Sequence, residues 1–213
     1  MNSENEKILE SLRDLLGDQE SLKLIKISTA SLKCSKRRCM ILLLMSFCLL
    51  IPLWYIGSSS HTIDSTIKII QLSNDVIIPI FAMLFTGYAL FQALVGGNTL
   101  KKMLIEKINN ASAFKTYNLY FFSLAIYFLC IIILNFILLI VFENIPPDWA
   151  FPYLTQFANS VWATLLLLIY VIVNVNALIE VKSFLYNLYQ CFSINAYANV
   201  ITSLGKEDKT IGF

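Results

Sequence analysis

The sequence predicts an all-α, polytopic membrane protein with four transmembrane helices and an amphipathic helix ahead of them. Hydrophobic residues make up 57% of the 213 residues and charged residues only 14%, whereas about a quarter of an average soluble domain is charged. Residues 116–142 contain no charged side chain. As a helix rising ~1.5 Å per residue, this run exceeds the ~30 Å hydrocarbon core of a bilayer. It is apolar on every side, which fits neither a soluble amphipathic helix nor a core strand.

Residues 1–38 are predicted to form an N-terminal segment ahead of the membrane domain, below the ~40 residues at which small domains usually need outside help to fold. Ser3 and Glu6 have the spacing of a capping box. Apolar residues then recur at helical intervals, at Ile8, Leu9, Leu12, Leu15 and Leu16. The polar face of this helix mixes acids and bases, which favours a protein-binding or self-packing helix over one built only for anionic lipid. A second helix is expected near residues 22–27.

Four apolar runs are predicted to cross the membrane and to form a transmembrane domain of residues 39–181. They are residues 39–56, 76–95, 116–142 and 157–181. The connections at 57–75 and 143–156 are predicted to be loops outside the cell. The connection at 98–115 is amphipathic and is expected to form a short helix at the membrane surface. Residues 182–213 are expected to continue the fourth span as a cytoplasmic helix and tail.

The basic residues set the predicted orientation. Of the 16 Lys and Arg residues, only Lys68 lies in a predicted outer loop. By the positive-inside rule, both termini are therefore expected in the cytoplasm. The protein is expected in the cell inner (plasma) membrane. Neither predicted outer loop contains one of the five cysteines, so a disulfide framework is not expected.

The sequence predicts neither an enzyme nor a cofactor or metal site. It has no phosphate loop, no serine nucleophile elbow and no HExxH motif. His61, the single histidine, lies three residues before Asp64, and this is the one imaginable acid/base or metal pair. A solvated loop histidine is the simpler interpretation. The basic cluster before the first span is interpreted as a topology signal, and direct nucleic-acid binding is not expected.

Asparagines inside the apolar runs are the candidate functional residues of the membrane domain: Asn135 in the third span, and Asn159, Asn174 and Asn176 in the fourth. An amide in hydrocarbon needs a hydrogen-bond partner, so these side chains are predicted to make contacts between helices or to line a pore. Asn174 and Asn176 lie about 200° apart around a helix and are not expected to face the same neighbour. A position of both near the cytoplasmic interface is the alternative.

Basic and tyrosine side chains on the predicted cytoplasmic side are candidates for contact with a soluble partner or with lipid. They are Arg13, Lys33, Arg37, Arg38, Lys101, Lys102, Lys107, Tyr186 and Tyr189.

The layout of the chain resembles the small membrane subunits of bacterial antiphage defence systems, such as KwaA, the membrane component of the Kiwa system. The resemblance covers the four spans, the cytoplasmic termini and the short outer loops, and no specific motif. It implies a homo-oligomeric membrane sensor that docks a soluble cytoplasmic protein. The leading hypothesis is therefore a non-enzymatic sensor or anchor, and the alternative is a pore or channel that depolarises the membrane.

Overall fold

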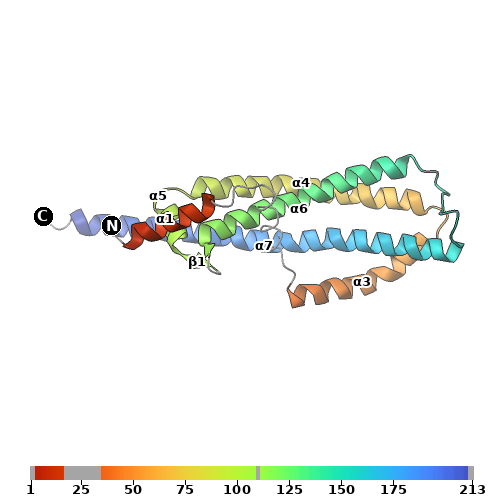
Figure 1. Cartoon of the computed structure of the whole chain (residues 1–213), viewed down its shortest axis with the longest axis horizontal. Coiled ribbons are helices and arrows are strands. Elements are labelled where there is room, and N and C mark those ends of the chain that lie inside the picture. The colour runs from red at the N-terminus through yellow and green to blue at the C-terminus, as the bar shows by residue number, and fades with distance from the viewer. Residues whose placement is uncertain (1–2, 17–34, 109–110, 211–213) are drawn as a thin grey trace. The chain divides into compact units, whose positions relative to one another are not determined.

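The structure is a computed structural model of the chain, and it describes residues 3–16, 35–108 and 111–210 (Figure 1). The second helix predicted near residues 22–27 and the candidate contact Lys33 lie outside these residues. The helices are α1 (Ser3–Leu16), α3 (Lys36–Gly57), α4 (Thr62–Leu94), α5 (Gly97–Ile105), α6 (Ala113–Glu143) and α7 (Gln156–Thr210). In the described ranges, the strands are β1 (Lys107–Ile108) and β2 (Ala111–Ser112), which pair antiparallel.

Four helices of the described chain are long and apolar enough to cross a membrane: α3, α4, α6 and α7. The prediction of an all-α polytopic membrane protein with four spans is confirmed. With 22 residues, α3 is about 33 Å long, close to the thickness of the hydrocarbon core. The other three are longer, and the 55 residues of α7 make one helix of about 80 Å. The fourth predicted span and residues 182–210 therefore belong to a single helix.

The prediction of an outer loop at 57–75 is wrong for most of these residues, because α4 already begins at Thr62. The buried residues Ile63, Thr66, Ile70 and Ile77 follow one another at helical spacing and form the inner face of this helix. Polar residues between them hide that pattern in the sequence. The turn between α3 and α4 is short, and the Thr62 hydroxyl closes it by donating to the Ile56 carbonyl at 2.9 Å.

The predicted surface helix at 98–115 corresponds to α5, and the β1–β2 hairpin that follows it was not predicted. The expected outer connection at 143–156 is a short non-helical segment between α6 and α7.

The chain divides into two compact units, and the boundary between them falls within α4, α6 and α7. Unit 1 comprises Met1–Lys33, Met83–Ala125 and Lys182–Phe213. Unit 2 comprises Cys34–Ala82 and Ile126–Val181.

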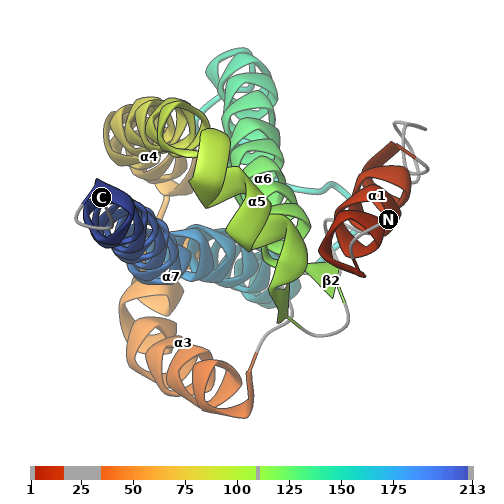
Figure 2. The same cartoon turned by 90° about the vertical axis from the view of Figure 1, so that its left-hand side faces the viewer.

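Unit 1 has an aromatic core. Phe91, which is fully buried, lies 5.0 Å from Phe121 between ring centroids, and Phe121 lies 5.6 Å from Phe184. Gly87 allows this packing, because a Cβ at this position would lie 2.3 Å from the Phe184 ring. In the same unit, α1 lies beside α5 (Figure 2), and the buried Ser11 hydroxyl donates to the Leu104 carbonyl at 2.8 Å.

Candidate functional site

Polar side chains of unit 2 meet in two clusters among the membrane helices. The asparagine cluster consists of Ser73 and Asn74 on α4, Asn135 on α6, and Tyr170 and Asn174 on α7. The arginine cluster consists of Arg38 on α3, Tyr127 on α6, and Asn176 and Glu180 on α7. Together they link all four helices that are able to cross the membrane.

Asn135 is the centre of the asparagine cluster and has no exposed surface. Its amide nitrogen donates to the Ser73 hydroxyl at 3.2 Å and to the Asn74 side-chain oxygen at 2.8 Å. Its oxygen accepts from the Tyr170 hydroxyl at 2.9 Å. Both amide hydrogens are therefore used, and the cost of burying this polar group is offset by bonds to two other helices.

Asn174 closes the asparagine cluster on the side of α7. Its side-chain oxygen accepts from the Ser73 hydroxyl at 2.6 Å, and its nitrogen donates to the Tyr170 carbonyl at 2.9 Å. Ser73 thus accepts from one asparagine and donates to another. The cluster satisfies these side chains within one chain.

Arg38 is the centre of the arginine cluster. Its guanidinium forms an ion pair with the Glu180 carboxylate, and the two side chains are only 13% and 6% exposed. It also donates from Nε to the Asn176 side-chain oxygen at 2.7 Å and from Nη2 to the Asn176 backbone carbonyl at 2.9 Å. A planar guanidinium with several donors suits such a convergent set of acceptors.

Local structure positions the groups of the arginine cluster. Ser35 is the N-cap of α3, where its side chain accepts from the Arg38 backbone N–H at 3.3 Å, so Arg38 lies in the first turn of that helix. Asn176 and Glu180 are four residues apart and therefore share one face of α7. Tyr127 braces the same region, since its hydroxyl donates to the Val173 carbonyl and accepts from the Asn176 amide, both at 3.1 Å.

The structure separates the four predicted asparagines into three environments. Asn135 and Asn174 come together in the asparagine cluster, and Asn176 lies in the arginine cluster. Asn174 and Asn176 contact different helices, as their spacing around α7 requires. Asn159 belongs to neither cluster, because its side chain bonds the backbone N–H and C=O of Phe151 at 3.1 and 3.2 Å and braces the connection between α6 and α7.

Several members of the clusters were not expected from the sequence. Ser73 and Asn74 fall in the predicted outer loop at 57–75, and nothing in the sequence marks Tyr127 or Tyr170 among the other tyrosines. One signal was available for the ion pair, because a carboxylate inside an apolar span, here Glu180, calls for a cationic partner.

The predicted partner or lipid contacts also differ in their surroundings. The Arg38 guanidinium is bonded to Glu180 and Asn176 within the arginine cluster. Arg13, Arg37, Lys101, Lys107, Tyr186 and Tyr189 are exposed.

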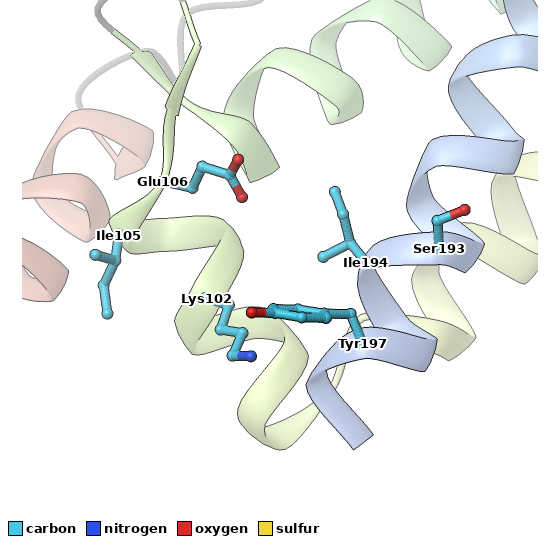
Figure 3. A pocket seen from close by; sticks show the side chains of 6 residues that line it. All are labelled: Lys102, Ile105, Glu106, Ser193, Ile194 and Tyr197. Atoms are coloured by element: carbon cyan, nitrogen blue, oxygen red, sulfur yellow. The ribbon is translucent and has the colours of Figure 1, made fainter. Parts of the chain in front are cut away.

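Lys102 lines an open pocket of about 620 Å³ in unit 1 (Figure 3). The other lining residues are Ile105, Glu106, Ser193, Ile194 and Tyr197. Lys102 Nζ lies 4.4 Å from the centre of the Tyr197 ring, a cation–π distance. This nitrogen is buried without a hydrogen-bond partner among the described residues.

No protein family, curated protein or solved structure matches this chain. Its chemistry is therefore inferred from the contacts above. The two clusters place amides, hydroxyls and one ion pair between helices, where each satisfies another, and this arrangement can hold four helices in one register.

Proposed function

We propose that this multi-pass membrane protein is a non-enzymatic sensor or anchor that docks a soluble cytoplasmic partner. The observation that supports the proposal is that the polar side chains between its membrane helices are bonded to one another inside one chain. A pore lined by these amides would leave them facing water, whereas Asn135 has no exposed surface and both of its amide hydrogens are bonded.

The packing of α3 supports a sensing role. Of the four membrane-length helices, α3 is the least buried, and its buried residues are Leu53 and Gly57, both near its C-terminal end. Near its other end, α3 is held by the contacts of Arg38. Since weakly packed elements are the ones that move at low cost, a disturbance of the membrane that displaces α3 would first have to break the arginine cluster.

Unit 1 provides groups suited to docking a partner. Tyr186 and Tyr189 are 63% and 66% exposed on α7, and Lys101 and Arg13 are exposed as well. Tyrosine and arginine are enriched in protein interfaces. The proposed location is the inner membrane, and the distribution of the basic residues along the chain supports an orientation with both termini in the cytoplasm. The resemblance to KwaA supports a homo-oligomer that acts in antiphage defence.

The test is purification of the tagged chain from native membranes in mild detergent, with mass spectrometry of the proteins that co-elute. A stoichiometric soluble protein should accompany the wild type and be lost from the Tyr186→Ala, Tyr189→Ala double variant. The matched control is Tyr153→Ala, whose side chain is 96% exposed in unit 2 and which should retain the partner. A partner that survives the double variant, or the absence of any partner, would contradict this function.

A pore or channel is the second candidate, and one observation favours it. Lys68, Gln71 and Asp75 of α4 are exposed on a helix that is able to cross the membrane, and rings of charged side chains are a common device of ion pathways. If purified protein conducts ions in planar bilayers, Gln71→Leu should reduce the current. Asn174→Leu should leave it unchanged, because Asn174 is bonded inside the chain.

A further inference from the structure

The connection between α6 and α7 carries an exposed patch of apolar side chains. Its residues 144–155 contain only one charged side chain and no lysine or arginine. We name its exposed apolar residues Trp149, Phe151, Tyr153 and Leu154 the connection patch. The Trp149 and Phe151 rings pack edge to face, with their centroids 4.8 Å apart. Exposed apolar patches of this kind mark sites of interaction with a protein or a membrane.

The connection is held against the start of α7. The Asn159 side chain bonds both the backbone N–H and the C=O of Phe151, and its nitrogen also donates to the Leu154 carbonyl at 3.4 Å. Asn159 is three residues past Gln156, where α7 begins, which is ~4.5 Å along the helix axis. The connection patch therefore lies beside the first turn of α7.

Exposed aromatic side chains of two membrane-length helices lie at the same end of unit 2 (Figure 1). Trp54 and Tyr55 are in the last turn of α3, Phe157 is in the first turn of α7, and all three are exposed. The Trp54 and Phe157 rings are 6.0 Å apart between centroids. Phe157 follows Leu154 by three positions, so the connection patch adjoins the exposed faces of α3 and α7.

The length of α3 places this end of unit 2 at the boundary of the membrane. Since α3 is about as long as the hydrocarbon core is thick, Trp54 and Tyr55 lie at the edge of a bilayer that α3 spans. Phe157 contacts Trp54 and lies at the same edge, and the connection patch lies beside it. Tryptophan and tyrosine concentrate at this level of membrane proteins, because their rings are apolar but carry one polar N–H or O–H group.

The other connection at this end has a different character. The turn between α3 and α4, residues 58–61, consists of three serines and a histidine, and all four are exposed. Such a composition suits water. A position at this end of the bundle therefore does not by itself require aromatic side chains, and the connection patch calls for a separate explanation.

We propose that the connection patch is a membrane-interface anchor, and that its occupant is the headgroup layer of the bilayer that the four helices cross. The patch continues the lipid-facing surface of α3 and α7, and its Trp149 and Tyr153 are the amphipathic side chains that favour this layer. A soluble protein would have to reach the first turn of α7 between faces that lipid already covers. The anchor does not depend on the docking of a soluble partner by unit 1.

Tryptophan fluorescence of the full chain in phosphatidylcholine vesicles tests the proposal. The chain has three tryptophans, so Trp54→Phe combined with Trp162→Phe leaves Trp149 as the only one. The vesicles carry bromine, a contact quencher, on acyl-chain carbons either next to the headgroup or near the chain ends. Trp149 should lose most of its emission to bromine next to the headgroup and much less to bromine near the chain ends.

Two further single-tryptophan chains are the matched controls. Trp162 alone should be quenched more strongly by the deeper bromine than Trp149 is, because it is exposed on α7 and lies ~9 Å along the helix from Gln156. Ser60→Trp, with the three native tryptophans replaced by phenylalanine, reports on the polar turn between α3 and α4. It should be quenched by iodide in the buffer and hardly by bromine in the lipid.

Iodide on both sides of the membrane distinguishes the other occupants. Quenching of Trp149 by bromine well above that of Ser60→Trp supports the anchor, whether or not iodide also quenches, because the headgroup layer contains water. Quenching of Trp149 by iodide alone overturns the proposal and places the patch in the aqueous phase. Quenching by neither overturns it as well, since a second copy then covers the patch. Equal quenching of Trp149 and Ser60→Trp by bromine also overturns it.

A second measurement applies if the chain with Trp149 alone does not accumulate. Trp149→Phe is then introduced into the otherwise native chain, which keeps Trp54 and Trp162. This variant should lose part of the emission that bromine next to the headgroup quenches in the native chain. If the quenched part of the emission is unchanged, Trp149 does not contact lipid and the proposal fails.

Discussion

Removal of Arg38 should destabilise unit 2 strongly, because it leaves the Glu180 carboxylate without its counter-ion. The carboxylate side chain is 6% exposed, and loss of one partner of a buried ion pair typically costs about 3–5 kcal/mol. We therefore expect Arg38→Met to lose about 4 kcal/mol of unfolding free energy. For a chain of about 200 residues, at roughly 2–4 °C per kcal/mol, this is a fall in Tm of about 10 °C.

The assay is thermal unfolding in mild detergent, followed by the fraction of protein that stays monodisperse. Arg37→Met is the matched control, because Arg37 is the exposed neighbour of Arg38, and it should change stability by less than about 0.5 kcal/mol. The double variant Arg38→Met, Glu180→Met replaces both charges by apolar side chains of similar size. It should recover most of the loss, since such replacements of buried pairs are often neutral.

Two results would refute this reasoning. Equal Tm values for Arg38→Met and Arg37→Met would mean that the ion pair contributes nothing to the packing of α3. With Glu180→Met measured alone as well, a double variant whose loss equals the sum of the Arg38→Met and Glu180→Met losses would mean that Arg38 and Glu180 act independently.

Three further substitutions test other contacts by the same thermal assay. Asn135→Leu removes three hydrogen bonds, and at about 0.6 kcal/mol for each bond between membrane helices it should cost ~2 kcal/mol; no loss would mean that the asparagine cluster does not hold the helices. Gly87→Ala places a methyl group 2.3 Å from the buried Phe184 ring and should lower the free energy of unfolding by about 1–3 kcal/mol. Gly96→Ala is the control, because its methyl group meets nothing within 4 Å, and it should lower this free energy by under about 1 kcal/mol. Ser11→Ala should cost about 1 kcal/mol and speed proteolysis of α1, and unchanged proteolysis would contradict its role in attaching α1 to α5.

The membrane helices could be predicted from the sequence because each contains a long apolar run, and that property is local. The continuity of the fourth span with residues 182–210 was predicted for the same reason, since no proline or glycine interrupts it before Gly205. The first half of α4 does not stand out in the sequence, because Lys68, Gln71 and Asp75 lower its mean hydropathy, although its buried face repeats at helical spacing.

The partners of the polar residues could not be predicted in the same way. Asn135 bonds Ser73, 62 positions earlier in the chain, and Arg38 pairs with Glu180, 142 positions later. An amide in an apolar run indicates that a partner exists, but which helix supplies it depends on the packing of the bundle. The aromatic core of unit 1 could not be predicted for the same reason. The need for glycine at position 87 becomes clear only when Phe184 is known to lie against it.

The exposure of α3 also has a consequence for how this chain tolerates variation. No residue from position 39 to 52 is buried, so any side chain that dissolves in lipid should serve there, and interchange of leucine, isoleucine, methionine and phenylalanine should be silent. Tolerance should end abruptly at Gly57, where a methyl group would collide with Thr164 at 2.4 Å, and at Arg38. In saturation mutagenesis of α3, tolerance in the middle of the helix should therefore depend only on the hydropathy of the new side chain. A specific side chain should be required only near the two ends.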